Sequence, residues 1–335
     1  MALPSILVTG GAGYIGSAVC HALQQRGYVP VTLDDLRHGH PSAVKFGPLI
    51  EGDVGDTALV QKICAEHKPV AALHFAALIE VAESVREPAR YIDNNVHKAQ
   101  RLFQALQSSG VTKVVFSSTA AVYGMPGRAG AIAEDWPLQP INPYGQTKLD
   151  AENFLRGLLG VTSVALRYFN AAGALPEVGL GEAHRPETHL VPNALLSLLN
   201  LKAEPLTVFG TDYPTPDGTA VRDYIHIADL AEAHLRALGY LLQGGKTEAV
   251  NLGTGTGASI KTVLDSIQNI TGKAVPFVYG PRRLGDPPFL VADNKRALSI
   301  LGWQPRLGLT DIVTSAYEWH SSAIYRALMD GEAAG

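Results

Sequence analysis

The residues best suited to do chemistry are a tyrosine and a lysine four positions apart, Tyr144 and Lys148. Asn142 can cap a helix and Pro143 suits its first position, so the pair lies on one helical face with an ammonium near a phenol. A free tyrosine has a pKa near ~10, and a unit charge at about 4 Å contributes on the order of 4 kcal/mol at an effective dielectric of ~20. The pair predicts a general base whose pKa is lowered towards neutrality, although this spacing also arises by chance.

A hydroxyl side chain follows the short apolar run 114–116, which has the character of a buried strand. Ligands of a parallel sheet collect at the carboxyl ends of its strands. We therefore expect Thr119 to bridge a substrate hydroxyl and the Tyr144 phenol, the alternative being a simple strand-end turn.

A glycine-rich turn lies between the first apolar run, Ile6 to Val8, and a helical pattern. Glycine permits backbone conformations and close approaches that a diphosphate needs, and a helix N-terminus offers it free N–H groups and a positive dipole end. The turn predicts a dinucleotide site, although a glycine triplet alone also suits an ordinary turn. The predicted contacts are Gly10, Gly13, Tyr14, Ile15 and Gly16.

An aspartate ends the second apolar run at the distance expected for a ribose ligand. Asp34 stands about 18 residues after Gly16, close to the roughly 20 typical of dinucleotide sites. A carboxylate there repels a 2′-phosphate, so NAD is favoured over NADP, and Arg37 is interpreted as a solvated loop cation. Asp53 and Val54 follow a further apparent strand that ends near Glu51, and they suit the adenine edge, but Asp53 could equally cap the next helix.

The elements that must position these residues alternate between short apolar runs and helical patterns through the first 170 residues. This alternation predicts an α/β fold with a doubly wound parallel sheet of the Rossmann type. The predicted strands are 6–8, 29–33, 70–75, 114–116 and 164–166, and the predicted helices are 17–26, 58–66, 89–108 and 143–159.

After Asn170 the alternation loosens into a Gly- and Pro-rich stretch, 173–192, which is interpreted as a surface loop. The expected division is an NAD-binding domain, 1–170, and a smaller α/β substrate lobe, 171–335, with some later segments returning to the first domain. The later predicted elements are a helix at 228–242, a strand at 250–252, a helix at 259–271 and a strand at 275–278.

Composition limits the function classes. With 46% hydrophobic and 17% charged residues and a net charge of -4, the chain is globular and has no basic excess for nucleic acid. The sequence shows no leader and no apolar run long enough to span a bilayer, so a cytoplasmic protein is expected. Cys20 and Cys64 lack metal-ligand spacing and are expected to be buried free thiols, so no metal is predicted.

With these residues in place, the chain resembles the extended short-chain dehydrogenase/reductases, and within them the family of UDP-glucose 4-epimerases. The most characteristic blocks are Asp217 to His226 and Arg282-Arg283-x-Gly285-Asp286. Further blocks are 9–16, 74–77, 83–85, 93–96, 117–124 and 166–170.

The resemblance implies interconversion of UDP-galactose and UDP-glucose with NAD that stays bound. Tyr144 would take the proton of the sugar 4-hydroxyl while C4 gives a hydride to NAD. The 4-keto sugar would then turn over in the site and receive the hydride on its other face. The resemblance also implies a homodimer, for which the long predicted helices 89–108 and 143–159 are the candidate interface, although their periodicity suits helices packed on the sheet equally well.

Further site residues come from the resemblance alone. It implies cofactor contacts at Phe75, Ala76, Ala77, Asn94, Ser117 and Phe169. It implies substrate contacts at Asn170, His189, Leu190, Thr207, Val208, Phe209, Arg222, Arg283, Asp286 and Leu290. Among these, Arg222 and Arg283 match a diphosphate clamp and Thr207 to Phe209 match the uracil side.

Three positions depart from the family pattern. Ile79 stands where some members have a lysine beside the cofactor, and His189 where some have an asparagine. Leu290 replaces a tyrosine that limits the sugar pocket in some members, so N-acetylated hexosamines could enter.

Competing functions remain open to different degrees. A nucleotide-sugar 4,6-dehydratase needs an Asp/Glu pair after Thr119, but Ala120 and Ala121 follow here. A UDP-pentose or UDP-N-acetylglucosamine 4-epimerase stays open. A non-catalytic NAD sensor has no need for Tyr144, Lys148 and Thr119 together.

Overall fold

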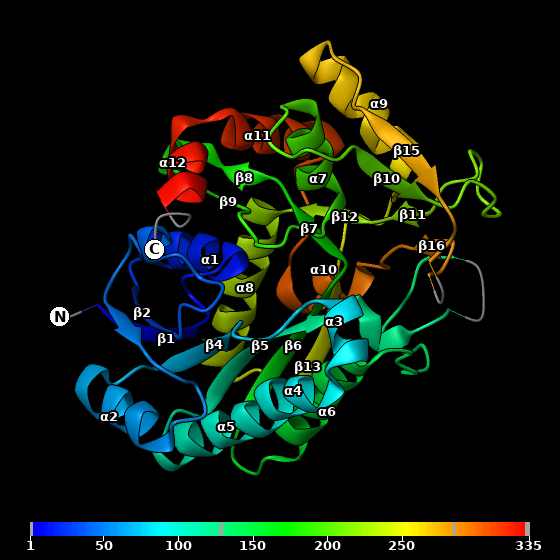
Figure 1. The fold of residues 1–335 in the computed structure, drawn as a ribbon. Helices are drawn as coiled ribbons and strands as arrows, with labels where there is room; N and C mark the ends of the chain where they lie inside the picture. Colours follow the sequence, from blue (N-terminus) through cyan, green and yellow to red (C-terminus); the bar gives the residue numbers. More distant parts are fainter. Residues whose placement is uncertain (1–2, 127–129, 284–285, 332–335) are drawn as a thin grey trace.

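A seven-stranded sheet forms the centre of the computed structural model, which describes residues 3–126, 130–283 and 286–331 (Figure 1). The strands run in the order β13-β6-β5-β4-β1-β2-β3, and every neighbouring pair is parallel. They are β1 (Ser5–Thr9), β2 (Val29–Asp34), β3 (Leu49–Glu51), β4 (Ala71–His74), β5 (Lys113–Thr119), β6 (Thr162–Tyr168) and β13 (Glu248–Leu252). The predicted doubly wound α/β architecture is confirmed.

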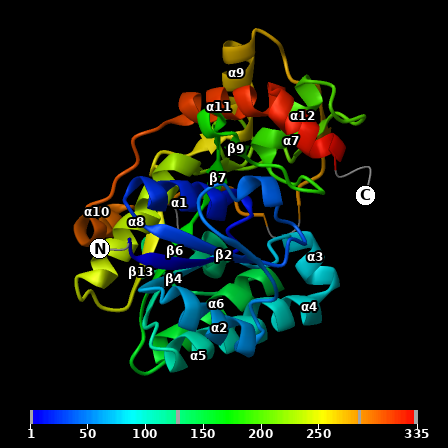
Figure 2. The same cartoon turned by 90° about the vertical axis from the view of Figure 1, so that its left-hand side faces the viewer.

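Helices cover both faces of this sheet (Figure 2). One face packs against α1 (Tyr14–Gln25) and α8 (Ile227–Leu242), and the other against α2 (Thr57–His67), α5 (Ala99–Ser108) and α6 (Pro143–Gly157). Ile6 and Val8 of β1 join the first apolar cluster, whereas Leu7 joins the second. Because successive side chains of a strand point to opposite faces and both faces are buried, the strands are continuous apolar runs.

The long helix predicted over 89–108 is interrupted. The structure divides it into α4 (Pro88–Ile92), a π-helical segment η2 (Asp93–Lys98) and α5. A π-helical turn inserts an extra residue into the helical repeat and often occurs at functional sites. This insertion is invisible to a periodicity of 3.6, which explains why one continuous helix was predicted.

A second lobe lies above the carboxyl ends of the strands (Figure 1). Its apolar cluster contains residues of α7 (Leu190–Leu198), α9 (Ile260–Thr271) and α11 (Leu309–Ser321). Its short strands pair as β10 (Leu206–Phe209) with β15 (Phe277–Gly280), β11 (Val221–Arg222) with β14 (Ala258–Ser259) and β16 (Phe289–Leu290), and β12 (Tyr224–His226) with β7 (Asn170–Ala172). The last predicted strand therefore begins two residues later than expected, at Phe277.

The surface loop predicted over 173–192 is wrong. This stretch contains an antiparallel pair, β8 (Ala174–Leu175) and β9 (Leu180–Gly181), and the start of α7. Gly179 has a φ of 61° in the turn between the two strands, so its glycine marks a tight reversal rather than an open loop. Ala174, Leu180 and Glu182 are buried.

Two findings concern the surroundings of the chain. Among the described helices, none has the length and apolarity that crossing a membrane requires. Cys20 and Cys64 are both buried and unpaired, as predicted.

Candidate active site

The candidate site lies along the carboxyl edge of the central sheet. Because the strands are parallel, their carboxyl ends share this edge, where ligands of doubly wound sheets bind. The structure brings the following predicted residues there: Gly10 and Gly13 after β1, Asp34 at the end of β2, Phe75 to Ala77 after β4, Ser117 and Thr119 in β5, and Phe169 and Asn170 after β6.

The glycine turn has the shape of a phosphate loop. Gly10 has a φ of 74°, and a Cβ there would lie 2.5 Å from the Ala76 nitrogen. At Gly16 a Cβ would lie 2.1 Å from the Gly10 carbonyl oxygen. Gly13 is the N-cap of α1 and provides no side-chain cap, so the first turn of the helix keeps its positive end for an anion. The turn fits a bound diphosphate.

Tyr14 and Ile15 open α1 directly behind this turn. The Tyr14 hydroxyl donates to the Gly173 carbonyl at 2.6 Å, so it joins the glycine turn to the start of the second lobe. Ile15 packs partly buried against the apolar cluster of α1 and the sheet. Both are placed beside the predicted phosphate site.

Asp34 connects β2 to the glycine turn. Its two carboxylate oxygens accept the N–H of Ala12 at 3.0 Å and of Leu36 at 2.9 Å. Burial raises the pKa of Asp34, and the two backbone N–H groups partly oppose this shift. A carboxylate held at the end of β2 can still accept ribose hydroxyls, because each oxygen has a second lone pair.

Asp53 does not cap the following helix. That cap is Asp56, which accepts the Leu59 N–H at 3.0 Å, so the capping alternative for Asp53 is wrong. Asp53 accepts the Gly55 N–H at 2.7 Å and forms an ion pair with Lys98. Burial alone would raise the pKa of Asp53, but Lys98 and Gly55 lower it overall. Val54 beside it is buried.

The helix α6, which carries Tyr144 and Lys148, begins as predicted. The Asn142 side chain accepts the Gly145 N–H at 2.8 Å, and Pro143 is the first helical residue. Lys148 is buried on this helix, and its ammonium donates to the Ser117 carbonyl oxygen at 2.9 Å. The end of β5 and the pair on α6 are thus held together.

Burial decides the pKa values of the pair. It raises the pKa of Tyr144 to about 12, although a hydrogen bond with the Thr119 side chain opposes it. It also lowers the pKa of Lys148 to about 7, with Glu152 opposing. The predicted lowering of the tyrosine pKa is therefore wrong for the protein alone. The reason is that desolvation by burial dominates, while the Lys148 ammonium is directed to the Ser117 carbonyl.

Thr119 fits both positions predicted for it, a strand-end turn and a place beside Tyr144. Its hydroxyl oxygen accepts the Ala121 N–H at 3.1 Å, which is the predicted strand-end turn. The same side chain forms a hydrogen bond with the Tyr144 phenol, and this bond lowers the tyrosine pKa. The hydroxyl is therefore placed to bridge the phenol and a substrate.

A buried ion pair behind the site was not predicted. Arg167 on β6 donates to Glu152 on α6, with Nε to Oε1 at 3.0 Å and Nη2 to Oε2 at 2.6 Å. The two side chains are 2% and 1% exposed, and Ser118 donates to the same carboxylate. The family block around Arg167 was the only sequence signal, because a buried arginine has no signature of its own.

Asn95, in the π-helical segment, was also missed by the sequence analysis. Its side chain accepts the Leu78 N–H at 2.9 Å, and donates to the Leu78 carbonyl at 2.9 Å and to Thr147 at 3.3 Å. It thereby ties the loop after β4 to α6. The predicted Asn94 lies next to it and donates to the Asn95 side chain at 3.0 Å.

Most of the predicted substrate residues of the second lobe lie in two groups. Arg222 forms an ion pair with Asp286, and Leu290 is its register partner on the neighbouring strand β16. The Arg283 guanidinium lies 4.1 Å from the ring centre of Phe209, at the end of the predicted uracil-side strand Thr207–Val208–Phe209. Gly285 of the same motif lies outside the described residues.

Asn170 contacts Asp223, which was also missed by the sequence analysis. Its side chain donates to the Asp223 carbonyl at 3.2 Å. The Asp223 carboxylate is fully buried and accepts N–H groups of Thr254, Gly255 and Ala292 at 2.7, 2.9 and 3.1 Å. Asp223 therefore joins the strands that carry Asn170, Arg222 and Leu290.

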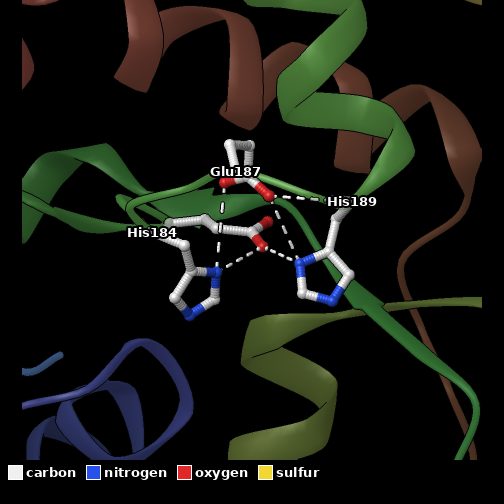
Figure 3. Close-up of side chains that lie close together, drawn as sticks. His184, Glu187 and His189 are labelled. Carbon is white, nitrogen blue, oxygen red and sulfur yellow. Dashed lines mark hydrogen bonds and ion pairs between the residues drawn. The ribbon is translucent and has the colours of Figure 1, made fainter. Parts of the chain in front are cut away.

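His189 and Leu190 stand at the start of α7. The His189 imidazole bonds to Glu182 and lies close to Glu187, in a cluster with His184 (Figure 3). The His189 ring therefore belongs to a defined polar cluster, which the alternative of a plain loop histidine does not include.

Comparisons with known proteins agree with this arrangement. Residues 6–253 match the NAD dependent epimerase/dehydratase family. A UDP-glucose 4-epimerase of Rhizobium meliloti is 50% identical over 320 residues, which cover 95% of this chain and 97% of the relative. The structure of UDP-glucose 4-epimerase from Brucella ovis in complex with NAD is 46% identical, with a TM-score of 0.91 over 94% of this chain and 97% of that chain. The structure from Stenotrophomonas maltophila with bound NAD and formylated UDP-arabinopyranose is 38% identical, with a TM-score of 0.92 over 98% of this chain and 99% of that chain.

Proposed function

Since this chain belongs to the NAD dependent epimerase/dehydratase family, we propose that it is a UDP-glucose 4-epimerase, which interconverts UDP-galactose and UDP-glucose through a 4-keto sugar. The observation that carries the proposal is the placement of Tyr144, Thr119 and Lys148 at the carboxyl edge of the sheet, beside the glycine turn. A hydride-transfer site needs a proton acceptor at this position.

The residues present fit NAD. Gly10, Gly13 and Gly16 would hold its diphosphate at the α1 N-terminus, and Asp34 would accept ribose hydroxyls. Further contacts would come from Tyr14, Ile15, Asp53, Val54, Phe75, Ala76, Ala77, Asn94, Ser117 and Phe169. When bound, NAD supplies the hydride acceptor and donor for sugar C4.

The protein's own part is the movement of one proton. Tyr144 would take it from the sugar 4-hydroxyl, with Thr119 orienting both hydroxyls. Because burial raises the pKa of Tyr144 to about 12, the base form depends on positive charge brought into the buried site. Lys148, with a pKa lowered to about 7, is part protonated near neutrality and provides some of that charge.

The second lobe would hold the nucleotide and leave the sugar free to turn. Arg222 and Arg283 suit the diphosphate because a guanidinium fork pairs with two oxygens. Asn170, Asp286, His189, Leu190 and the strand Thr207–Phe209 would complete the UDP side. Binding energy concentrated on the diphosphate allows the keto sugar to rotate between the two hydride transfers.

The proposal is tested by incubating the purified protein with UDP-galactose without added NAD and separating the products. We expect UDP-glucose to form, and Tyr144→Phe to lower the rate about 10²–10⁴-fold, because the proton acceptor is removed. Tyr279→Phe is the matched control, because that tyrosine is 63% exposed on β15. Absence of conversion by the unmodified protein, even with NAD supplied, would contradict the proposal and favour a UDP-pentose enzyme or a non-catalytic sensor.

A second candidate activity, 4-epimerisation of UDP-N-acetylhexosamines, rests on Leu290. This side chain packs partly buried with Phe169 against the apolar cluster next to Thr119 and α6. A leucine is shorter than tyrosine and leaves more room for an acetamido group. Leu290→Tyr should reduce turnover of UDP-N-acetylgalactosamine more than that of UDP-galactose. An equal effect on both substrates would remove the candidate.

We further propose a cytoplasmic homodimer whose lobes divide near residue 170, with β13 and α8 returning to the first lobe. The two unpaired cysteines suit a reducing compartment.

On α3 (Val81–Arg86), Val81 and Val85 are 45% and 62% exposed, which suits an interface between copies. Light scattering should give twice the chain mass, and Val85→Glu should shift the protein towards the monomer.

A further inference from the structure

Two carboxylates and two imidazoles meet in the segment between β9 and α7 (Figure 3). They come from Glu182, His184, Glu187 and His189, and one ligand atom from each lies within 4.8 Å of all the others. His184 Nδ1 lies 3.1 Å from Glu182 Oε1 and 3.9 Å from Glu187 Oε2. His189 Nδ1 bonds to Glu182 and lies 3.4 Å from Glu187 Oε1.

The charges of this cluster demand cations. The Glu182 and Glu187 side chains are 3% and 8% exposed. Two buried carboxylates side by side are unfavourable unless positive charge neutralises them. Two protonated imidazoles would do so, and so would one divalent cation bound by neutral imidazoles. In the second solution each imidazole nitrogen binds the cation in place of a proton.

The distances agree with the second solution. Zinc binds imidazole nitrogen at about 2.0–2.1 Å and carboxylate oxygen at about 2.0–2.2 Å, usually in a tetrahedron. Neighbouring ligand atoms of such a tetrahedron lie roughly 3.3 Å apart. Separations of 3.1, 3.4 and 3.9 Å between ring nitrogens and carboxylate oxygens lie near this value, whereas the hydrogen bond of 2.5 Å between His189 Nδ1 and Glu182 Oε1 would have to lengthen when the metal binds.

The backbone already orients one carboxylate. The N–H groups of Thr188 and His189 donate to Glu187 Oε1 at 2.7 and 2.8 Å. Partners of this kind fix a ligand without touching the metal. They leave Glu187 Oε2 turned towards His184.

We propose that Glu182, His184, Glu187 and His189 bind one divalent transition-metal ion of the zinc class. Mixed nitrogen and oxygen ligands favour zinc and its neighbours over magnesium or calcium, which prefer oxygen alone. The expectation of no metal rests on cysteine spacing and does not consider this His/Glu segment. The proposal does not depend on the proposed epimerase activity.

The site would fasten the second lobe to the nucleotide-binding half. The His184 ring packs edge-on against Tyr14, the first residue of α1, with ring centres 6.3 Å apart. His40 bonds to the Ala183 carbonyl at 2.9 Å, and the Thr188 hydroxyl donates to Glu80 after β4 at 2.9 Å. A metal that fixes the segment 182–189 would therefore stabilise the fold around the glycine turn.

The test is a titration of the full chain with zinc chloride after treatment with a chelator and its removal. We expect one equivalent of Zn²⁺ per chain and a higher Tm on binding. His184→Gln should weaken the affinity by more than about 100-fold, because losing a direct ligand exceeds the effect of losing an outer partner. His97→Gln, at a histidine side chain 57% exposed, should bind zinc like the unmodified protein.

Cobalt gives a readout that needs no variant. Co²⁺ bound to the unmodified chain should show the intense visible bands of four-coordinate cobalt, and binding should weaken towards pH 6 as protons compete for the imidazoles. Absence of zinc binding, absence of those bands, or equal affinity in a folded His184→Gln variant would each overturn the proposal.

Discussion

Replacing Lys148 by methionine should stabilise the protein even though it removes a residue of the proposed active site. The lysine side chain is buried, and its ammonium donates to the Ser117 carbonyl oxygen at 2.9 Å. Burial lowers the pKa of Lys148 to about 7, with Glu152 opposing. Folding therefore favours the neutral amine, whereas the unfolded chain keeps the ammonium up to the ordinary lysine pKa of 10.5.

The magnitude follows from this shift. From the ordinary pKa of 10.5 to about 7, the full penalty is about 5 kcal/mol at ~1.4 kcal/mol per unit. It is fully present below pH 7 and is lost as the pH rises towards 10.5, because the unfolded chain binds the extra proton in this interval. Methionine carries no such penalty but leaves the Ser117 carbonyl without this donor, at about 1 kcal/mol. The variant should be more stable by about 3 kcal/mol at pH 7.5 and by less than about 1 kcal/mol at pH 9.5.

Denaturant unfolding of both proteins at the two pH values measures this difference. Lys62→Met, at a lysine side chain 70% exposed, controls for the loss of a surface lysine. The reasoning is refuted if the advantage of Lys148→Met is the same at both pH values or grows as the pH rises. The epimerase rate should fall in the same variant, which would separate stability from activity.

Further predictions concern glycines and the buried ion pair. Gly16→Ala should destabilise the protein and abolish NAD retention, because the new Cβ would lie 2.1 Å from a carbonyl oxygen. Gly239→Ala on α8 is the control: its Cβ meets nothing within 4 Å, so the substitution should raise the free energy of unfolding by about 1 kcal/mol. Absorbance of retained cofactor and thermal unfolding measure both, and equal effects would contradict the steric reasoning. Glu152→Gln should lower the free energy of unfolding by about 3–5 kcal/mol, because it leaves Arg167 buried without its partner. Glu248→Gln, in a more exposed pair, should cost less than about 1 kcal/mol, and comparable losses in the two variants would argue against a role for burial.

The sequence predicts those parts of the fold that follow from local pattern. Short apolar runs between helical segments are enough to place the central strands and to predict that they are parallel. The interruption at Asp93–Lys98 is different, because a π-helical turn depends on the tertiary contacts of Asn95. The stretch 173–192 fails for a related reason, since its glycines and prolines are equally typical of loops and of tight turns between short strands.

The sequence predicts which residues form the candidate site better than it predicts their pKa values. Tyr144 meets Thr119, and Lys148 of the same helix meets Ser117 of the same strand, because helix spacing and strand ends are visible in the sequence. Their pKa values are not visible there, since burial is a property of the packed molecule. Long-range partners such as Glu152 with Arg167 likewise require the fold.

The place of β13 at the sheet edge constrains how the chain can fold during synthesis. Its residue Glu248 pairs with Val164 of β6, and much of the second lobe lies between the two in the chain. At about 5–20 residues per second, a ribosome needs roughly ten seconds to deliver this interval. Until then β6 is an open parallel edge, the kind of surface on which nascent chains aggregate. A chain stopped at residue 170 would keep that edge permanently bare, so the nucleotide-binding half is a unit in space without being one in the order of synthesis.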